Sequence, residues 1–221
     1  MKRCLRLLLV CALLFGCNSQ PIAGWAEASY KHLDRFKEFF MAGEEPLAEA
    51  HFQKAVAEIK KSGDLSALQK AYLTKYAVHL AVLKHFTGDE YLQVEAVAPI
   101  AENRNFFAFL RASPAAQVSA ELLPRQYREF FAASLSGEAA RRNSAVAKIE
   151  DPLSRLIAIG WLVSQDRHDE EILLLAEDTA SRQGWKKALL AYLDRLTAHY
   201  LAKGETKKAE AVEGRIRLMA N

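Results

Sequence analysis

The chain has 221 residues, of which 51% are hydrophobic and 26% are charged. This composition is typical of a folded globular protein and excludes intrinsic disorder as the main state. The three cysteines are Cys4, Cys11 and Cys17, all close to the N-terminus. A disulfide framework and a cysteine-based zinc site are therefore excluded for the rest of the chain.

Positive charge is concentrated at the N-terminus. Residues 1–16 contain Lys2, Arg3 and Arg6 and no acidic residue. The chain has 30 Lys and Arg in total, so the 27 that follow this segment equal the 27 Asp and Glu, and the formal charge of +3 belongs to the first 16 residues. A body without net positive charge has no field that attracts phosphate backbones, so we expect no nucleic-acid partner.

The first 16 residues have the pattern of a secretory signal peptide, with a basic start and the apolar run Leu7–Phe15. This run is shorter than the roughly 20 residues of a membrane-spanning helix. The junction Leu14–Cys17, with its small Gly16 before the cysteine, resembles the lipobox of bacterial lipoproteins. The resemblance implies that residues 1–16 are removed as a signal peptide and that Cys17 becomes the site of lipid attachment, palmitate among the acyl chains.

Lipidation would make residues 17–25 a lipidated N-terminus and linker. Several acyl chains on one cysteine would anchor the protein firmly to a membrane. Asn18 follows the cysteine, where lipoproteins retained in the inner membrane have Asp. By this resemblance we expect a periplasm-facing anchor in the outer membrane, with the inner membrane as the alternative. Trp25 is expected either to contact lipid headgroups or to pack under the first helix.

The remaining chain predicts α-helix almost throughout. Ala, Leu, Glu, Lys and Arg dominate, apolar residues recur every three or four positions, and no segment alternates over the length of a strand. The predicted helices are 26–42, 46–61, 65–85, 89–97, 101–111, 115–134, 137–148, 152–165, 169–182, 185–203 and 206–219. Short connections make each helix antiparallel to the next, so we expect an all-α domain over 26–221 made of stacked antiparallel helical hairpins.

Glycine and proline mark the ends of these helices. Asp151-Pro152 and Ser113-Pro114 are typical helix starts, and Pro124 is expected to kink or split the helix predicted over 115–134. The gaps also hold glycines, which a helix C-terminus favours because it needs a residue tolerant of positive φ. These are Gly43, Gly63, Gly88, Gly137, Gly184 and Gly204.

Two segments resemble the tetratricopeptide motif, a repeated helix-turn-helix of 34 residues. In residues 29–62, Gly43 begins the turn, and Ala48, Phe52 and Ala55 occupy the small, aromatic and small positions of the second helix. Residues 190–221 resemble it through Leu193, Leu196, Tyr200, Gly204 and Ala209. The resemblance implies a tetratricopeptide-like right-handed solenoid.

The same resemblance predicts a binding groove along the first helix. Its groove positions correspond to Tyr30, Leu33, Lys37, Phe40 and Met41. An apolar stripe with one lysine suits a peptide that has hydrophobic anchors and a carboxylate. The alternative is that the next helix or the C-terminal hairpin covers these residues.

Catalytic, metal and cofactor sites are not predicted. No two of the six histidines have the i, i+4 spacing of a helical metal site. The segment His168–Glu171 is expected to be an acidic first turn of a helix, because consecutive helical residues diverge and cannot bind one ion. The aromatic segment Phe106–Leu110 is expected to fill the core rather than to form a ligand cage.

Two functions remain open. The first is a membrane-anchored periplasmic lipoprotein, not an enzyme, that acts as a protein-protein interaction adaptor or scaffold in cell-envelope assembly or secretion, with an envelope protein or peptide as its partner. The second is an enzyme or carrier acting on cell-wall glycan or lipid. A deep cleft with a buried acid of raised pKa would favour the enzyme.

Overall fold

The computed structural model describes residues 24–114 and 117–220, so Cys17 lies outside the described residues. In the described part there are eleven α-helices and a short 3₁₀ helix, η2, with no strand, which confirms the predicted all-α class. The α-helices are α1 (Gly24–Ala42), α2 (Glu45–Ser62), α3 (Leu65–Ala81), α4 (Asp89–Val97), α5 (Ala101–Leu110), α6 (Arg125–Leu135), α7 (Ala139–Ala147), α8 (Pro152–Ser164), α9 (Glu170–Arg182), α10 (Lys186–Ala202) and α11 (Thr206–Ala220), and η2 spans Ala120–Leu122.

The helix starts follow the predicted signals. The carboxylates of Asp64, Asp151 and Asp169 each accept a hydrogen bond from a backbone N–H in the first turn of α3, α8 and α9. These bonds satisfy amides that have no partner inside the helix. Pro124 divides the predicted helix 115–134 into η2 and α6. Helix α1 begins at Gly24, so the last two residues of the predicted linker 17–25 are helical.

The predicted helix 65–85 is too long, because α3 ends at Ala81. Leu83 has a left-handed φ of 56°, and the amide of Lys84 donates to the carbonyl of His79 at 2.9 Å, which reverses the chain. Ala112 after α5 and Asp166 after α8 have the same left-handed conformation, with φ of 52° and 53°. Left-handed helix ends usually contain glycine, so the sequence gives little sign of these three reversals.

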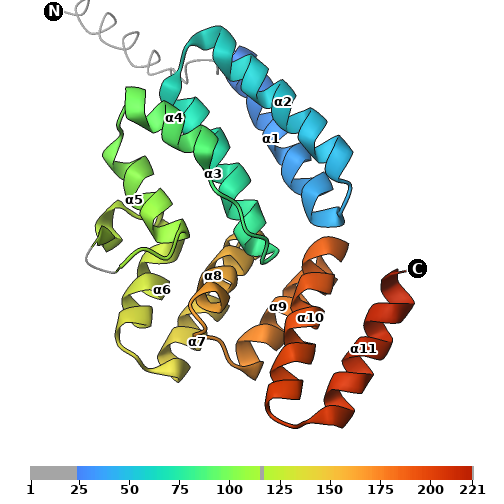
Figure 1. Cartoon of the computed structure of the whole chain (residues 1–221). Coiled ribbons are helices and arrows are strands. Elements are labelled where there is room, and N and C mark those ends of the chain that lie inside the picture. Colours follow the sequence, from blue (N-terminus) through green and yellow to red (C-terminus); the bar gives the residue numbers. More distant parts are fainter. Residues whose placement is uncertain (1–23, 115–116, 221) are drawn as a thin grey trace, which may run out of the picture.

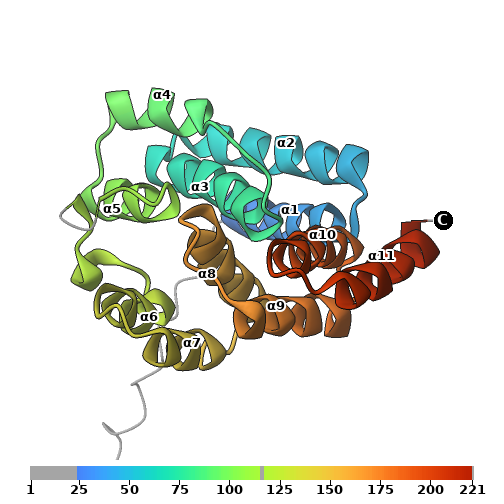
Figure 2. The same cartoon turned by 60° about the horizontal axis from the view of Figure 1, so that its bottom comes forward.

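Successive helices form hairpins whose packing is consistent with a helical solenoid (Figure 1). The path curves until α10 contacts α1, as the second view shows (Figure 2). At this contact the ammonium of Lys187 lies 2.7 Å from the carboxylate of Glu45 and 3.6 Å from the centre of the Phe40 ring. The two ends of the described chain therefore support each other.

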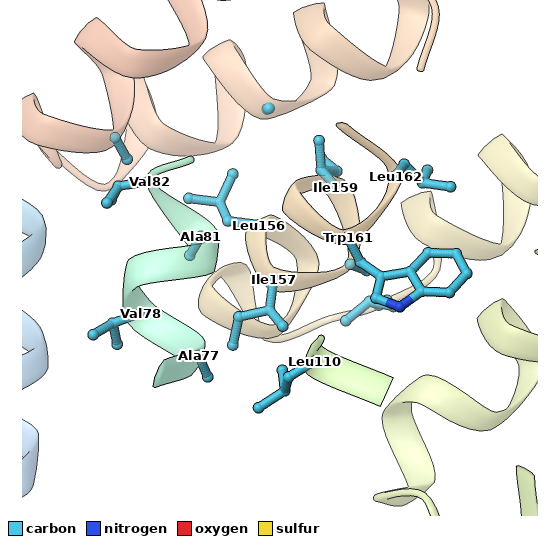
Figure 3. Close-up of a cluster of buried hydrophobic side chains, with 14 of the residues drawn as sticks. Ala77, Val78, Ala81, Val82, Leu110, Leu156, Ile157, Ile159, Trp161 and Leu162 are labelled. Carbon is cyan, nitrogen blue, oxygen red and sulfur yellow. The ribbon is translucent and has the colours of Figure 1, made fainter. Parts of the chain in front are cut away.

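Helix α8 lies in the middle of the core and contacts α3, α6, α7 and α9. Its apolar side chains pack against those of α3, which include Val78 and Ala81 (Figure 3). Trp161 is buried, stacks on Phe109 with ring centres 5.5 Å apart, and donates its indole N–H to the carbonyl of Phe109 at 2.7 Å. The segment Phe106–Leu110 therefore contributes Phe107, Phe109 and Leu110 to the core, as predicted.

Candidate binding groove

Two hollows lie on either side of α3. The first, of about 250 Å³, lies between α1 and α3, and the second, of about 400 Å³, lies between α3, α5 and the segment around η2. Both are lined by Lys70 and Thr74. We call the two hollows together the α3 groove. Its main lining residues are Trp25, Tyr30, Leu33 and Lys37 from α1, Lys70, Leu73 and Thr74 from α3, Phe106 from α5, and Leu122 of η2.

Helical spacing explains why these side chains meet. Residues three or four positions apart share one face of a helix, which places Tyr30, Leu33 and Lys37 together on α1. The same spacing places Lys70 and Thr74 together on α3. The groove is thus formed by alternate helices of the chain, α1, α3 and α5, while α2 packs on α1 and α4 packs on α3.

The α3 groove combines apolar surface with positive charge. Tyr30 is 61% exposed and Leu122 is 40% exposed. Lys37 forms an ion pair with Asp34 at 2.8 Å, and Lys70 is exposed where the two hollows meet. Trp25 packs against the core and lines the groove, which is the second of the two positions expected for it.

The sequence prediction for the groove is correct in part. Tyr30, Leu33 and Lys37 line the first hollow. Phe40 and Met41 do not line it, because their exposed fractions are 5% and 0% and both belong to the core. The expectation that these two face an open groove is wrong. Phe40 is covered by the return of α10 to the end of α1, which was the alternative explanation.

The prediction missed the groove residues outside α1. Lys70 and Thr74 line both hollows, and Phe106 and Leu122 line the second. Projecting the tetratricopeptide positions onto the third predicted helix could have identified Lys70 and Thr74. The contribution of Leu122 depends on the split at Pro124, which the sequence suggests but does not place in space.

The segment His168–Glu171 begins α9, as predicted. Asp169 caps the helix, accepts a hydrogen bond from Asn143 at 2.9 Å, and has a lowered pKa because these bonds and Arg142 outweigh the opposing effect of its burial. Glu170 accepts hydrogen bonds from Tyr200 at 2.9 Å and from Lys208 at 3.1 Å. These contacts join α7, α9, α10 and α11, so the acidic segment stabilises helix packing.

The fold brings two pairs of histidines together that are distant in sequence. The Nδ1 atoms of His32 and His51 are 3.0 Å apart, and the rings of His168 and His199 have centres 6.2 Å apart. Burial and the nearby His32, Lys54 and Arg35 lower the pKa of His51. Within residues 24–114 and 117–220, no group of three or more His, Cys, Asp or Glu side chains could hold a metal ion.

The carboxyl groups with shifted pKa all shift downward. Hydrogen bonding to Lys187 and its charge lower the pKa of Glu45, and hydrogen bonds from Lys208 and Tyr200 lower that of Glu170. Asp169 behaves in the same way. Carboxyl groups that are stabilised as anions act as ion-pair partners.

Buried His79 makes the stability of the fold dependent on pH. Its ring lies between those of Phe40 and Phe86, with centres 4.6 and 4.3 Å away, and its Nδ1 is 2.7 Å from the carbonyl oxygen of Lys75. Burial lowers its pKa below the ordinary 6.5 against the opposing effect of that hydrogen bond, and the ammonium groups of Lys187, Lys84 and Lys75 lower it further.

The unfolded chain should therefore bind a proton on His79 at a pH where the folded protein does not. Protonation then favours unfolding, so we expect full stability above about pH 7 and a loss of stability as the pH falls through 6.5. Thermal melts between pH 7.5 and 5.5 measure this. His79→Gln should reduce the pH dependence, whereas the exposed His85→Gln should retain it. Equal slopes for His79→Gln and the wild-type protein would contradict the assignment.

Comparison with known proteins gives no match to a family model, to a curated protein or to a solved structure. Among the residues described, no helix is both long and apolar enough to cross a bilayer. The fold and the site define an all-α protein of stacked hairpins with a groove across α3, and any function has to be inferred from them.

Proposed function

We propose that this protein is a membrane-anchored periplasmic lipoprotein that binds a segment of another envelope protein in the α3 groove. It would act as a protein-protein interaction adaptor or scaffold in cell-envelope assembly or secretion. The observation that supports this proposal best is that two hollows meet over Lys70 and Thr74. Together they offer an extended surface, which suits a peptide segment better than a compact substrate.

We further propose that the fold is a tetratricopeptide-like right-handed solenoid in which α1, α3 and α5 line the inner face. The hairpin of α1 and α2 supports this assignment. Ala48, Phe52 and Ala55, at the motif's small and aromatic positions, are at most 1% exposed. The rings of Phe52 and Phe36 have centres 5.0 Å apart, so the aromatic residue joins the two helices of the hairpin.

The chemistry of the groove restricts the partner. Tyr30, Leu33 and Phe106 offer apolar contacts, and Lys37 and Lys70 lie beside them. A segment with apolar anchors and an acidic group fits this combination. The anchor proposed at Cys17 would attach through the outer membrane, and the lipobox resemblance, which favours Asn18 over Asp there, supports that location.

Site-specific photo-crosslinking in intact membranes tests the groove. A photoreactive amino acid is placed at Tyr30 or Leu122 in the groove, or at Leu218, an 83% exposed control position on α11. We expect the same partner to be crosslinked from both groove positions and not from the control. Crosslinking of the same proteins with equal yield at all three positions would contradict the proposal.

Substitutions provide the matching loss of function. Lys70→Glu combined with Tyr30→Ala should reduce crosslinking from Leu122 about ten-fold, because it removes an aromatic anchor and reverses a charge. Exposed substitutions of this kind usually change stability by no more than about 0.5 kcal/mol, so the melting temperature should stay nearly constant. Leu218→Ala is the control and should leave crosslinking unchanged.

A further inference from the structure

A separate cavity of about 430 Å³ lies where the C-terminal ends of α3, α5 and α8 meet. It shares no lining residue with the α3 groove. Its size is within the range of about 300 to 1,000 Å³ that is usual for small-molecule sites. Its wall is mainly apolar and is formed by Tyr76, Leu80, Leu83, Phe86, Leu110 and Val163.

The charged residues that line this cavity are all basic. Lys84, His85 and Arg111 are exposed at its edge, and no Asp or Glu lines it. Lys84 makes only a long contact of 3.5 Å with Glu45. The guanidinium of Arg111 lies 5.5 Å from the centre of the Phe107 ring. The edge therefore attracts an anion.

Positive charge beside helix C-termini can also be explained by interaction with the last carbonyl groups of the helices. Here backbone amides occupy these carbonyls. The amide of Lys84 donates to His79 at 2.9 Å, and that of Ser113 donates to Ala108 at 3.0 Å. The exposed basic side chains are thus available for another partner.

The backbone at the cavity is also unusual. Leu83, which lines the cavity, has a φ of 56°, a conformation that a leucine rarely adopts. Its left-handed turn directs the chain into the segment that carries Lys84, His85 and Phe86. Residues held in such conformations are found preferentially at ligand sites, where the surrounding structure enforces them. The strained residue, the apolar wall and the basic edge coincide.

We propose that this cavity binds an anionic single-chain amphiphile of the long-chain fatty acid type. The hydrocarbon chain would lie against Leu80, Leu83 and Phe86. The carboxylate would interact with the basic groups at the edge, where charge-assisted hydrogen bonds are strongest. This inference is independent of peptide binding in the α3 groove, since the two sites have different lining residues.

Photoreactive probes test the site on the full chain held in nanodiscs of neutral lipid. One probe is a 16-carbon fatty acid with a diazirine on its chain, and the other is the matching alcohol. We expect the acid to label the segments 76–86 and 160–164, with about ten-fold less labelling by the alcohol because it lacks the charge. Equal labelling by acid and alcohol, or labelling spread over the whole surface, would overturn the proposal.

Two pairs of variants separate binding from nonspecific effects. Arg111→Glu should reduce labelling by the acid about ten-fold, whereas Arg141→Glu, another exposed arginine outside the cavity, should not. Ser164→Phe should fill the cavity and block both probes. Ser136→Phe is its control, because both serines are exposed and donate to the carbonyl three residues earlier, at 2.8 and 2.7 Å. Circular dichroism verifies that each variant is folded. Full labelling of folded Ser164→Phe would exclude the cavity as the site.

Discussion

Replacing Gly160 by alanine is expected to destabilise the protein by about 3 kcal/mol, the upper part of the range for overpacked cores. A Cβ atom on Gly160 would overlap the carbonyl oxygen of Leu80 and lie 3.0 Å from its carbonyl carbon. The obstacle is the backbone of α3, so rotation of a side chain cannot relieve it. Separating α3 from α8 would open the core around Trp161 (Figure 3).

Gly214→Ala is the matched control for this prediction. Gly214 lies within α11, and the nearest atom to a Cβ placed there is a guanidinium nitrogen of Arg217 at 3.8 Å. Alanine at this open helical position should stabilise the protein by about 0.5 to 1 kcal/mol. Denaturant unfolding of the two variants should give free-energy changes of opposite sign. A Gly160→Ala protein as stable as the wild type would show that α3 and α8 do not cross this closely.

Local sequence signals were sufficient to predict the helices. Apolar periodicity and capping residues act within a few positions, so the starts at Asp64, Asp151 and Asp169 and the break at Pro124 follow from adjacent residues. The error at the end of α3 arose because Leu83 adopts a left-handed conformation that local preference favours only for glycine. Packing of the surrounding helices overrides that preference.

Long-range packing could not be predicted in the same way. The contact of Glu45 with Lys187 joins residues 142 positions apart, and nothing near either residue indicates the other. The burial of Phe40 follows from this contact, and so the predicted groove was correct for Tyr30 and Leu33 but wrong at the end of the same helix face. The need for a glycine at position 160 likewise depends on α3, about 80 residues earlier.

The second large effect is expected from Cys17→Ala, which should abolish attachment of the protein to the membrane. The prediction rests on the junction Leu14–Cys17, and the acyl chains proposed there would supply nearly all of the membrane affinity. Seven residue steps, each at most about 3.6 Å, separate Cys17 from Gly24, so the anchor would hold the start of α1 within about 25 Å of the acylated cysteine. Loss of the anchor would therefore also remove the α3 groove from the membrane surface.

Incorporation of labelled palmitate and washing of membranes at high pH measure both consequences. The wild-type protein should incorporate label and stay in the membrane fraction, and Cys17→Ala should do neither. Cys11→Ala is the matched control, because it replaces a cysteine in the apolar run Leu7–Phe15 and leaves the junction intact, so it should behave as the wild type. If Cys17→Ala is processed to the mature size and resists the wash, then the lipobox assignment is wrong, and another part of the chain attaches the protein to the membrane.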